Sequence, residues 1–148
     1  MANTFSVKLL IHEPNLPVNF SISIDDEEKF SVTTTEKEYY FETEIPDDIG
    51  KVHSVKFTLS GKTDDHTTFD ENDNILSSAQ VELKEISFND MDITEVLIAN
   101  DPMMTYTHNS NGYTEEIVEN FYTEVMGYNG TIEIQYKTPL YAWLLDVM

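Results

Sequence analysis

Apolar and polar residues alternate along most of this chain. In residues 4–11, Phe5, Val7, Leu9 and Ile11 occupy every second position, and mostly polar residues lie between them. A period of two places every second side chain on the same face of an extended strand, so each such segment predicts a half-buried β-strand. The chain is therefore expected to be all-β.

The alternating segments are short, and turn-forming residues separate them. Gly, Pro, Asn and Asp fill the gaps, because they fix φ, tolerate positive φ or hydrogen-bond their own backbone. About eight strands at intervals of roughly 8–12 residues predict an antiparallel β-sandwich of the jelly-roll type. After the first strand, we expect strands at 18–24, 30–32, 39–45, 52–59, 81–88, 93–98, 104–106 and 131–136.

Three segments depart from this alternation. Residues 81–88 skip one position near Lys84 and Glu85, which predicts a β-bulge. Residues 62–78 are polar and lack periodicity, so we expect the longest loop there. In residues 115–126, apolar side chains recur at spacings of three and four, which makes a short helix an alternative to a strand.

Length and charge limit the classes of function. A chain of 148 residues is long enough for one core, so residues 1–148 are expected to form a single domain. With 28 acidic residues against 8 basic ones, the net charge is −20, which disfavours binding to nucleic acid or to anionic membranes. It favours cations, basic partner surfaces or simple solubility. No apolar stretch is typical of a signal peptide or a membrane span.

The polar stretch 62–78 is dense in oxygen ligands that suit Ca²⁺. Its spacing does not match a helix-loop-helix calcium loop, because Ile75 stands at the glycine position and Val81 at that of the closing glutamate. Asp and Asn are also the residues that turns use to bond their own backbone. A looser calcium site and a plain turn therefore both stay open, and the candidate ligands are Asp64, Asp65, Asp70 and Asp73.

Nothing in the sequence points to catalysis. The chain has no cysteine, and no nucleophile elbow, phosphate loop or dinucleotide motif occurs. Its four histidines lie far apart, and the many carboxylates single out no catalytic pair. We therefore expect a protein that is not an enzyme. Aromatic residues are expected mostly in the core, with the remainder exposed for binding to sugars or protein surfaces.

The last ten residues are the most apolar part of the chain. Asp146 is the only charged side chain among residues 139–148. Left in water, this segment would form a patch prone to aggregation, so we expect it to seal the core or to contact a neighbouring subunit. The candidate interface residues are Leu140, Tyr141, Trp143, Leu144 and Leu145.

Several segments between residues 52 and 148 resemble, in their order, small proteins of contractile-tailed marine phages that infect cyanobacteria. They are residues 55–63, 66–67, 70–75, 81–93, 127–131 and 138–145. The resemblance implies a structural or accessory virion protein, made in the host cytoplasm, that decorates the capsid or tail. Its partners would be other virion proteins or copies of itself.

A weaker resemblance links residues 55–90 to calcium-dependent, xylan-binding carbohydrate-binding modules, which are jelly-roll sandwiches. This chain has Ser60, Gly61 and Ser78 where those modules carry Asn, Asp and a calcium-binding Asp. The resemblance implies the same architecture with the metal site lost or moved. The alternative function is therefore binding to a surface glycan for host attachment, with or without Ca²⁺.

Overall fold

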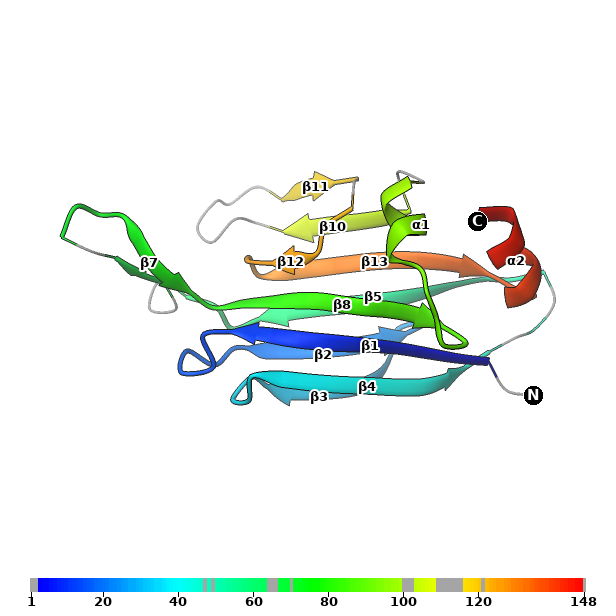
Figure 1. The fold of residues 1–148 in the computed structure, drawn as a ribbon, viewed down its shortest axis with the longest axis horizontal. Coiled ribbons are helices and arrows are strands. Elements are labelled where there is room, and N and C mark those ends of the chain that lie inside the picture. The colour runs from blue at the N-terminus through cyan, green and yellow to red at the C-terminus, as the bar shows by residue number, and fades with distance from the viewer. Residues whose placement is uncertain are drawn as a thin grey trace.

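The computed structural model describes residues 3–46, 48, 50–63, 67–69, 71–99, 103–108, 116–120 and 122–147. Within these ranges the chain forms two antiparallel β-sheets that pack face to face (Figure 1). Eight of the described strands contain five or more residues. The predicted class, an antiparallel β-sandwich of the jelly-roll type with about eight strands, is confirmed.

The five-stranded sheet has the order β12-β8-β1-β4, with β9 paired to β8. The first strand of the chain therefore lies inside its sheet, between β4 and β8. The bounds are β1 Asn3–His12, β4 Glu38–Ile45, β8 Gln80–Phe88, β9 Met91–Asp92 and β12 Val125–Met126.

The six-stranded sheet has the order β11-β10-β13-β5-β2-β3. Every neighbouring pair in it is antiparallel. The bounds are β2 Asn19–Ile24, β3 Glu27–Thr33, β5 Val52–Ser60, β10 Met104–His108, β11 Ile117–Glu119 and β13 Gly130–Lys137.

The core lies between the two sheets and is formed by the alternating apolar residues. The Phe5 ring contacts Phe57 across the sandwich, with ring centroids 6.0 Å apart, and Phe88 on the neighbouring strand at 5.3 Å. All three side chains are buried. The period-two pattern thus corresponds to burial, because every second side chain of a strand points into the core.

The predicted bulge in β8 is also confirmed. Ser6 pairs with Ser87 and Lys8 with Lys84, so β8 has one residue more than β1 in this interval. Glu85 takes up the extra length at φ 52°, and the Ser87 hydroxyl donates to its carbonyl. Ile86 and Phe88 consequently stay buried although the alternation is interrupted.

The helix considered for residues 115–126 is wrong for the part of that range that the structure describes. Residues 117–119 form β11, which pairs with β10, and residues 125–126 form β12, which pairs with β8. The helical spacing does not decide the structure here, because Ile117 and Val118 are exposed and a helix would not bury them. The backbone pairs with the edges of two existing strands instead.

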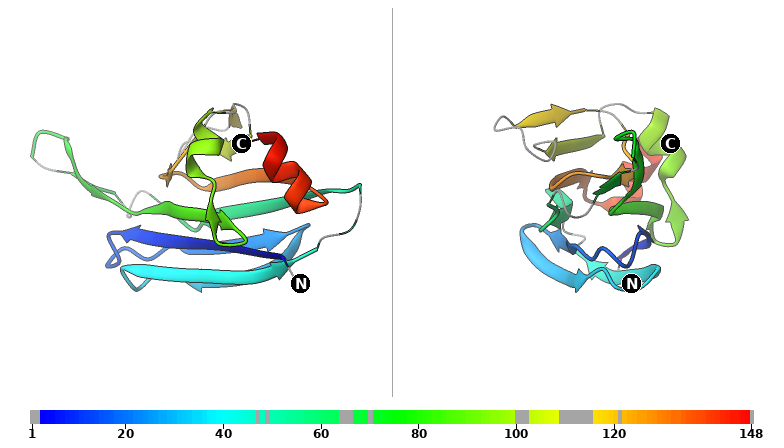
Figure 2. Two further views of the ribbon diagram at one scale, coloured as in Figure 1. Left: turned by 45° about the vertical axis from the view of Figure 1, so that its right-hand side comes forward. Right: turned by 90° about the vertical axis from the view of Figure 1, so that its left-hand side faces the viewer.

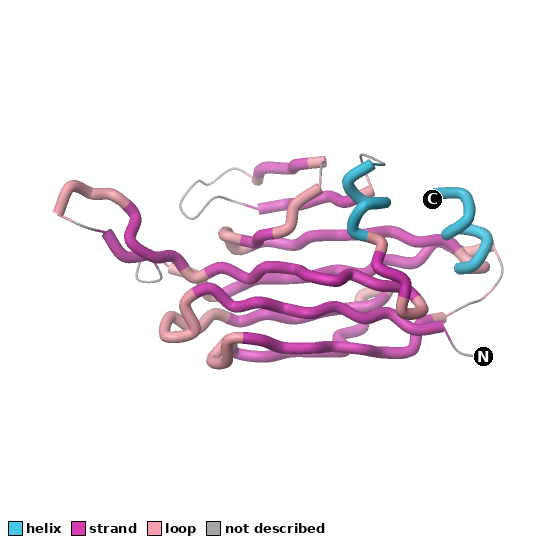
Figure 3. The backbone as a smooth tube through the Cα atoms, in the orientation of Figure 1, coloured by secondary structure: helices cyan, strands magenta, loops and turns pink. Residues whose placement is uncertain are grey.

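The strand expected at residues 93–98 is wrong too. Helix α1, Thr94–Ala99, occupies this place. Its first N–H, at Thr94, donates to the Asp92 carboxylate, and Ile93 and Leu97 bury one side of the turn. The last residues of the chain form helix α2, Leu140–Val147. Both helices lie toward the same end of the sandwich (Figure 3).

The long loop expected at residues 62–78 contains a third, two-stranded sheet. β6, Thr67–Phe69, and β7, Ile75–Ser78, pair as a hairpin that projects from the end of the sandwich opposite α2 (Figure 2). Polar hairpins lack the apolar alternation that predicts a strand, because neither face is buried. Among the described residues, no helix is long and apolar enough to cross a membrane.

Candidate functional site

A cavity of about 520 Å³ lies at the base of the β6–β7 hairpin. Its walls come from the segment just after β5, the hairpin, the first residue of β8, β10, β11 and residues 122–128. Tyrosine rings form one part of the lining, and an ammonium, a carboxylate, an amide and several hydroxyl groups form the rest. Residues far apart in sequence therefore meet around one hollow.

Tyr128 lines this cavity and is partly exposed. Its side chain is 40% exposed, and its ring stacks on the imidazole of His108 with centroids 4.8 Å apart and planes 11° from parallel. The Tyr106 hydroxyl accepts the Tyr128 N–H at 3.2 Å and donates to the Tyr128 carbonyl at 3.0 Å. Burial raises the pKa of Tyr106 to about 12. The Tyr128 ring is thus held in place by a stack and by its own backbone.

The packing beneath this ring depends on a glycine. Gly130 begins β13 opposite His108. A Cβ at this position would collide with the Thr107 carbonyl and lie 2.8 Å from the His108 Cβ. The β10 and β13 backbones therefore approach closely only because residue 130 has no side chain.

Lys62 is buried at the cavity wall, with only 5% of its surface exposed. Its Nζ donates to Ser78 Oγ at 2.8 Å and to the Gly127 carbonyl at 2.6 Å. Asn129 holds the Lys62 backbone through its amide, with contacts of 2.9 Å and 2.7 Å. Burial lowers the pKa of the Lys62 ammonium. Within the described ranges, no carboxylate forms an ion pair with it.

Glu119 supplies the carboxylate of the cavity. It lies opposite Tyr106 in the β10–β11 register, and its Oε2 is 3.1 Å from Nε2 of the buried His108. Tyr122 also lines the cavity, and burial raises the pKa of its hydroxyl. The cavity thus combines aromatic faces with hydrogen-bond donors and acceptors at fixed positions.

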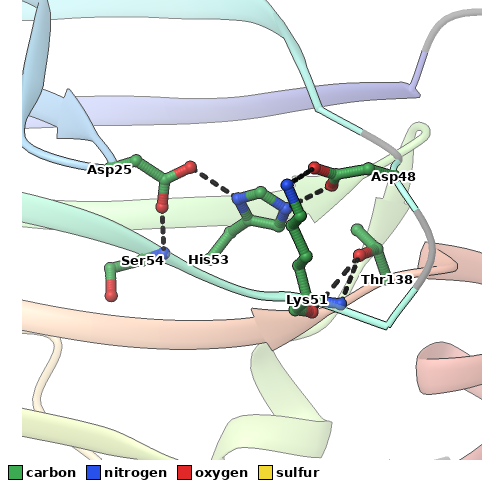
Figure 4. A network of polar contacts seen from close by, with 6 residues as sticks. All are labelled: Asp25, Asp48, Lys51, His53, Ser54 and Thr138. Carbon is green, nitrogen blue, oxygen red and sulfur yellow. Dashed lines mark hydrogen bonds and ion pairs between the residues drawn. The ribbon is translucent and has the colours of Figure 1, made fainter.

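A second polar cluster lies at the start of β5 (Figure 4). The buried His53 ring contacts Asp25 through Nδ1 at 2.5 Å and Asp48 through Nε2 at 2.7 Å. Asp25 also accepts the Ser54 N–H, and Lys51 pairs with Asp48 at 3.2 Å. The imidazole stacks on Tyr136. Its polar atoms are taken up by these contacts, so this cluster joins chain segments and offers no evident ligand site.

The predicted calcium ligands are only partly described. Asp73 lies exposed in the turn between β6 and β7 at φ 62°, which suits a turn residue. Asp64, Asp65 and Asp70 lie outside the described residues. In the part of the chain that the structure describes, no group of three or more His, Asp or Glu side chains is placed to hold a metal. A Ca²⁺ site in this segment stays a prediction.

The predicted interface residues of the tail fall into two groups. Leu140, Trp143 and Leu144 are buried, and the Trp143 ring lies edge-on to Phe88 with centroids 5.6 Å apart. Tyr141 and Leu145 are 74% and 60% exposed on the other side of α2. The interface assignment itself stays a prediction.

Sequence reasoning did not single out the cavity. Lys62 looked like one more polar residue after Gly61, and Tyr128 like a turn residue between two glycines. The one local signal was Tyr128 itself, because a turn lies at the surface and a tyrosine there is expected to stay partly exposed. Their meeting depends on which strands pair.

Comparison with known proteins assigns no family to this chain. No protein-family model matches the chain, and no curated protein matches its sequence. The chain is similar to a solved structure described as "vCBM60 in complex with galactobiose", a carbohydrate-binding module. The TM-score is 0.46 at 10% identity, over 88% of this chain and 96% of that one. The comparisons give no sequence-level support to the phage resemblance.

Proposed function

We propose that this chain is a non-catalytic binding protein whose cavity at the base of the β6–β7 hairpin takes a saccharide. The observation that carries the proposal is the Tyr128 ring, 40% exposed at the cavity and stacked on His108. A sugar ring has an apolar face of C–H groups and an edge of hydroxyl groups. It therefore needs an aromatic surface beside donors and acceptors.

The polar lining supports this reading. Lys62 donates, Glu119 accepts, and the Gln80 amide and the hydroxyls of Thr67 and Thr123 do both. Ligand sites in proteins typically combine aromatic or apolar walls with a few convergent polar groups. A mixed set of donors and acceptors fits a polyhydroxylated ligand better than a purely apolar one.

Preorganisation supports it as well. Tyr106 and His108 fix the Tyr128 ring before a ligand arrives, so little side-chain entropy is lost on binding. Residues that only fill space at a surface do not need a stack, two backbone hydrogen bonds and a glycine beneath them. The arrangement favours a ring that works as a platform.

The test is a titration of the ¹⁵N-labelled protein with a panel of oligosaccharides, followed by NMR. We expect shifts confined to residues around the cavity and saturable binding by at least one sugar. Tyr128→Ala should weaken that binding about tenfold or more, because a stacking surface is removed. Tyr40→Ala is the matched control, since Tyr40 is 62% exposed on β4 and far from the cavity. Equal losses in both variants, or no binding by any sugar, would contradict the proposal.

The structural or accessory role on a phage particle, and the virion location, stay predictions. They are compatible with a saccharide site, because a module carried on a particle could bind host-surface glycans. Detection of the protein at stoichiometric level in purified particles would decide the location.

A further inference from the structure

Lys62 differs from every other lysine of the chain. Five lysines form ion pairs with carboxylates and are partly exposed: Lys8, Lys29, Lys51, Lys56 and Lys84. Two more, Lys37 and Lys137, are exposed to solvent. Lys62 alone is buried, and its partners among the described residues are a hydroxyl and a carbonyl.

A buried ammonium with neutral partners is costly. Removing an ammonium from water carries a penalty of several kcal/mol, and a nearby anion normally offsets it. This chain has 28 carboxylates and 8 basic residues, so anions are plentiful. The direction of the Lys62 pKa, lowered by burial, agrees with a cation that lacks this compensation. Among the residues that the structure describes, no ion pair thus offsets the charge of the Lys62 ammonium at the cavity wall.

The geometry leaves one donor for a ligand. An ammonium has three N–H groups, and two of them are used by Ser78 and Gly127. No acceptor in the described ranges takes the third. The Lys62 backbone is held by Asn129, so the side chain is anchored at its base as well as at its tip. This is a fixed cation beside a hollow.

We infer that the ligand is an acidic saccharide, a sugar that carries a carboxylate or a sulfate bound by Lys62. The inference rests on the proposed saccharide site and names the class of its ligand. The acidic group would accept the remaining N–H of Lys62, and the sugar ring would lie against Tyr128. A charge-assisted hydrogen bond of this kind is about twice as strong as a neutral one.

The other titratable groups at the cavity are compatible with an anion. Glu119 is the only carboxylate among the described lining residues, and it faces the imidazole of His108 at 3.1 Å. Burial raises the pKa of the Tyr106 and Tyr122 hydroxyls, so both are neutral at pH 7.5. The net charge of −20 repels anions at long range, but at about 0.15 M salt the screening length is ~8 Å. Recognition would therefore depend on the local contact with Lys62.

The experiment compares matched disaccharides by calorimetry at pH 7.5 and 0.15 M NaCl. A galacturonic acid disaccharide, the galactose disaccharide of the same linkage and its sulfated derivative form the three arms. We expect one acidic arm to bind about tenfold more tightly than the neutral one, and the better of the two identifies the acidic group. Lys62→Met should abolish this preference, so that the ratio of acidic to neutral affinity falls to about one.

The outcomes separate this inference from the proposed function. Neutral binding as tight as acidic binding would overturn the inference and leave the saccharide site standing. Failure of all three arms, and of the wider panel, would overturn both.

A second measurement needs no variant, in case Lys62→Met does not fold. In the wild-type protein the ratio of acidic to neutral affinity should fall as the pH rises from 7.5 toward 10.5, because burial lowers the Lys62 pKa below its usual 10.5 and the ammonium loses its proton over this range. The neutral sugar corrects for effects of pH that do not involve the acidic group of the ligand. Tyr106, whose pKa is raised to about 12, stays neutral over this range. A constant ratio would overturn the inference.

Discussion

Nδ1 of His53 lies 2.5 Å from Oδ2 of Asp25, and the second ring nitrogen lies 2.7 Å from Asp48. Both nitrogens must donate to face two carboxylates, so this geometry selects the charged imidazolium. Burial by itself would lower the His53 pKa, but the hydrogen bonds to Asp25 and Asp48 outweigh it and raise the pKa. The contact joins the turn after β2 to the segment before β5.

This cluster predicts a pH-dependent stability. Because the His53 pKa is raised in the folded state, its contribution is complete below about pH 6.5 and is lost as the pH rises through the folded value. His53→Gln should lower the free energy of unfolding by about 1.5–3 kcal/mol at pH 6 and by less at pH 9. Urea unfolding at the two pH values measures this. His12→Gln, on a largely exposed residue, is the control, and an equal loss at both pH values would refute the assignment.

Acid should also weaken this cluster, through protonation of Asp48. The His53 hydrogen bond, with a smaller contribution from Lys51, lowers the Asp48 pKa. A lowered carboxyl pKa stabilises the fold above its unfolded value near 3.8, and this contribution is lost as the pH falls through the folded value. Stability from the cluster is therefore greatest between about pH 4 and 6.5.

Substitutions on the two sides of α2 should differ sharply in effect. Trp143→Ala removes a buried ring that contacts Phe88 and Tyr136, and we expect a loss of about 3–5 kcal/mol. Leu145→Ala, on the exposed side, should change stability by less than about 0.5 kcal/mol. Chemical denaturation of both variants provides the measurement. Deletion of residues 139–148 should unfold the domain. A truncated chain that stays folded but loses its oligomer would indicate that the helix serves a neighbouring subunit instead, and one that stays folded and assembles normally would contradict both roles.

Gly130→Ala should damage the fold and the cavity together. The new methyl group would collide with the Thr107 carbonyl and press on His108, on which the Tyr128 ring stacks. We expect a stability loss of about 1–3 kcal/mol or more and weaker saccharide binding. Gly50→Ala is the control. It introduces backbone strain without a steric clash, because Gly50 has φ 74° and no atom lies within 4 Å of an added Cβ. Gly50→Ala should lower the free energy of unfolding by about 1 kcal/mol and leave saccharide binding unchanged.

Salt should stabilise the domain. With a net charge of −20, repulsion between carboxylates opposes the compact state. Raising NaCl to about 0.5 M shortens the screening length below ~5 Å, so the melting temperature should rise. Calorimetric scans at low and high salt test this. A flat response would mean that ion pairs such as Lys8 with Glu38 already compensate the charge.

Calcium should bind weakly or not at all. The segment at 62–78 lacks the glycine and the closing glutamate of a strong loop, and Asp73 occupies a turn. Calorimetry with Ca²⁺ should therefore show no sub-micromolar site. Tight binding that disappears in Asp70→Ala and Asp73→Ala would reverse this conclusion.

Alternation predicted the strands whose inner face is buried, together with the bulge at Glu85, because burial on one face imposes a period of two. The same criterion failed for α1, where Ile93 and Leu97 bury a single helical turn too short to show a period of its own. It failed again for the β6–β7 hairpin, whose described Phe69 and Ile75 are exposed. Where neither face of a strand is buried, apolar and polar residues need not alternate, and the sequence pattern does not indicate a strand.

The cavity was beyond prediction for a different reason. Lys62, Tyr106, Glu119 and Tyr128 come from four separate segments, and nothing in any one of them indicates the others. Their proximity follows from the pairing of β10 with both β11 and β13 and from the pairing of β13 with β5. Pairing partners are a property of topology, which local periodicity does not encode.

The strand order also bears on when this domain can form during synthesis. β5 gains its second neighbour only when β13 is present, since Leu59 pairs with Gly130 and Val52 with Lys137. β1 likewise waits for β8. Until the last strand leaves the ribosome, a growing chain exposes strand edges and apolar faces that only later residues can cover, and such long-range pairing folds slowly. We therefore expect the sandwich to be completed only after β13 has emerged, and until then the heavy acidic charge limits aggregation of the partly folded chain.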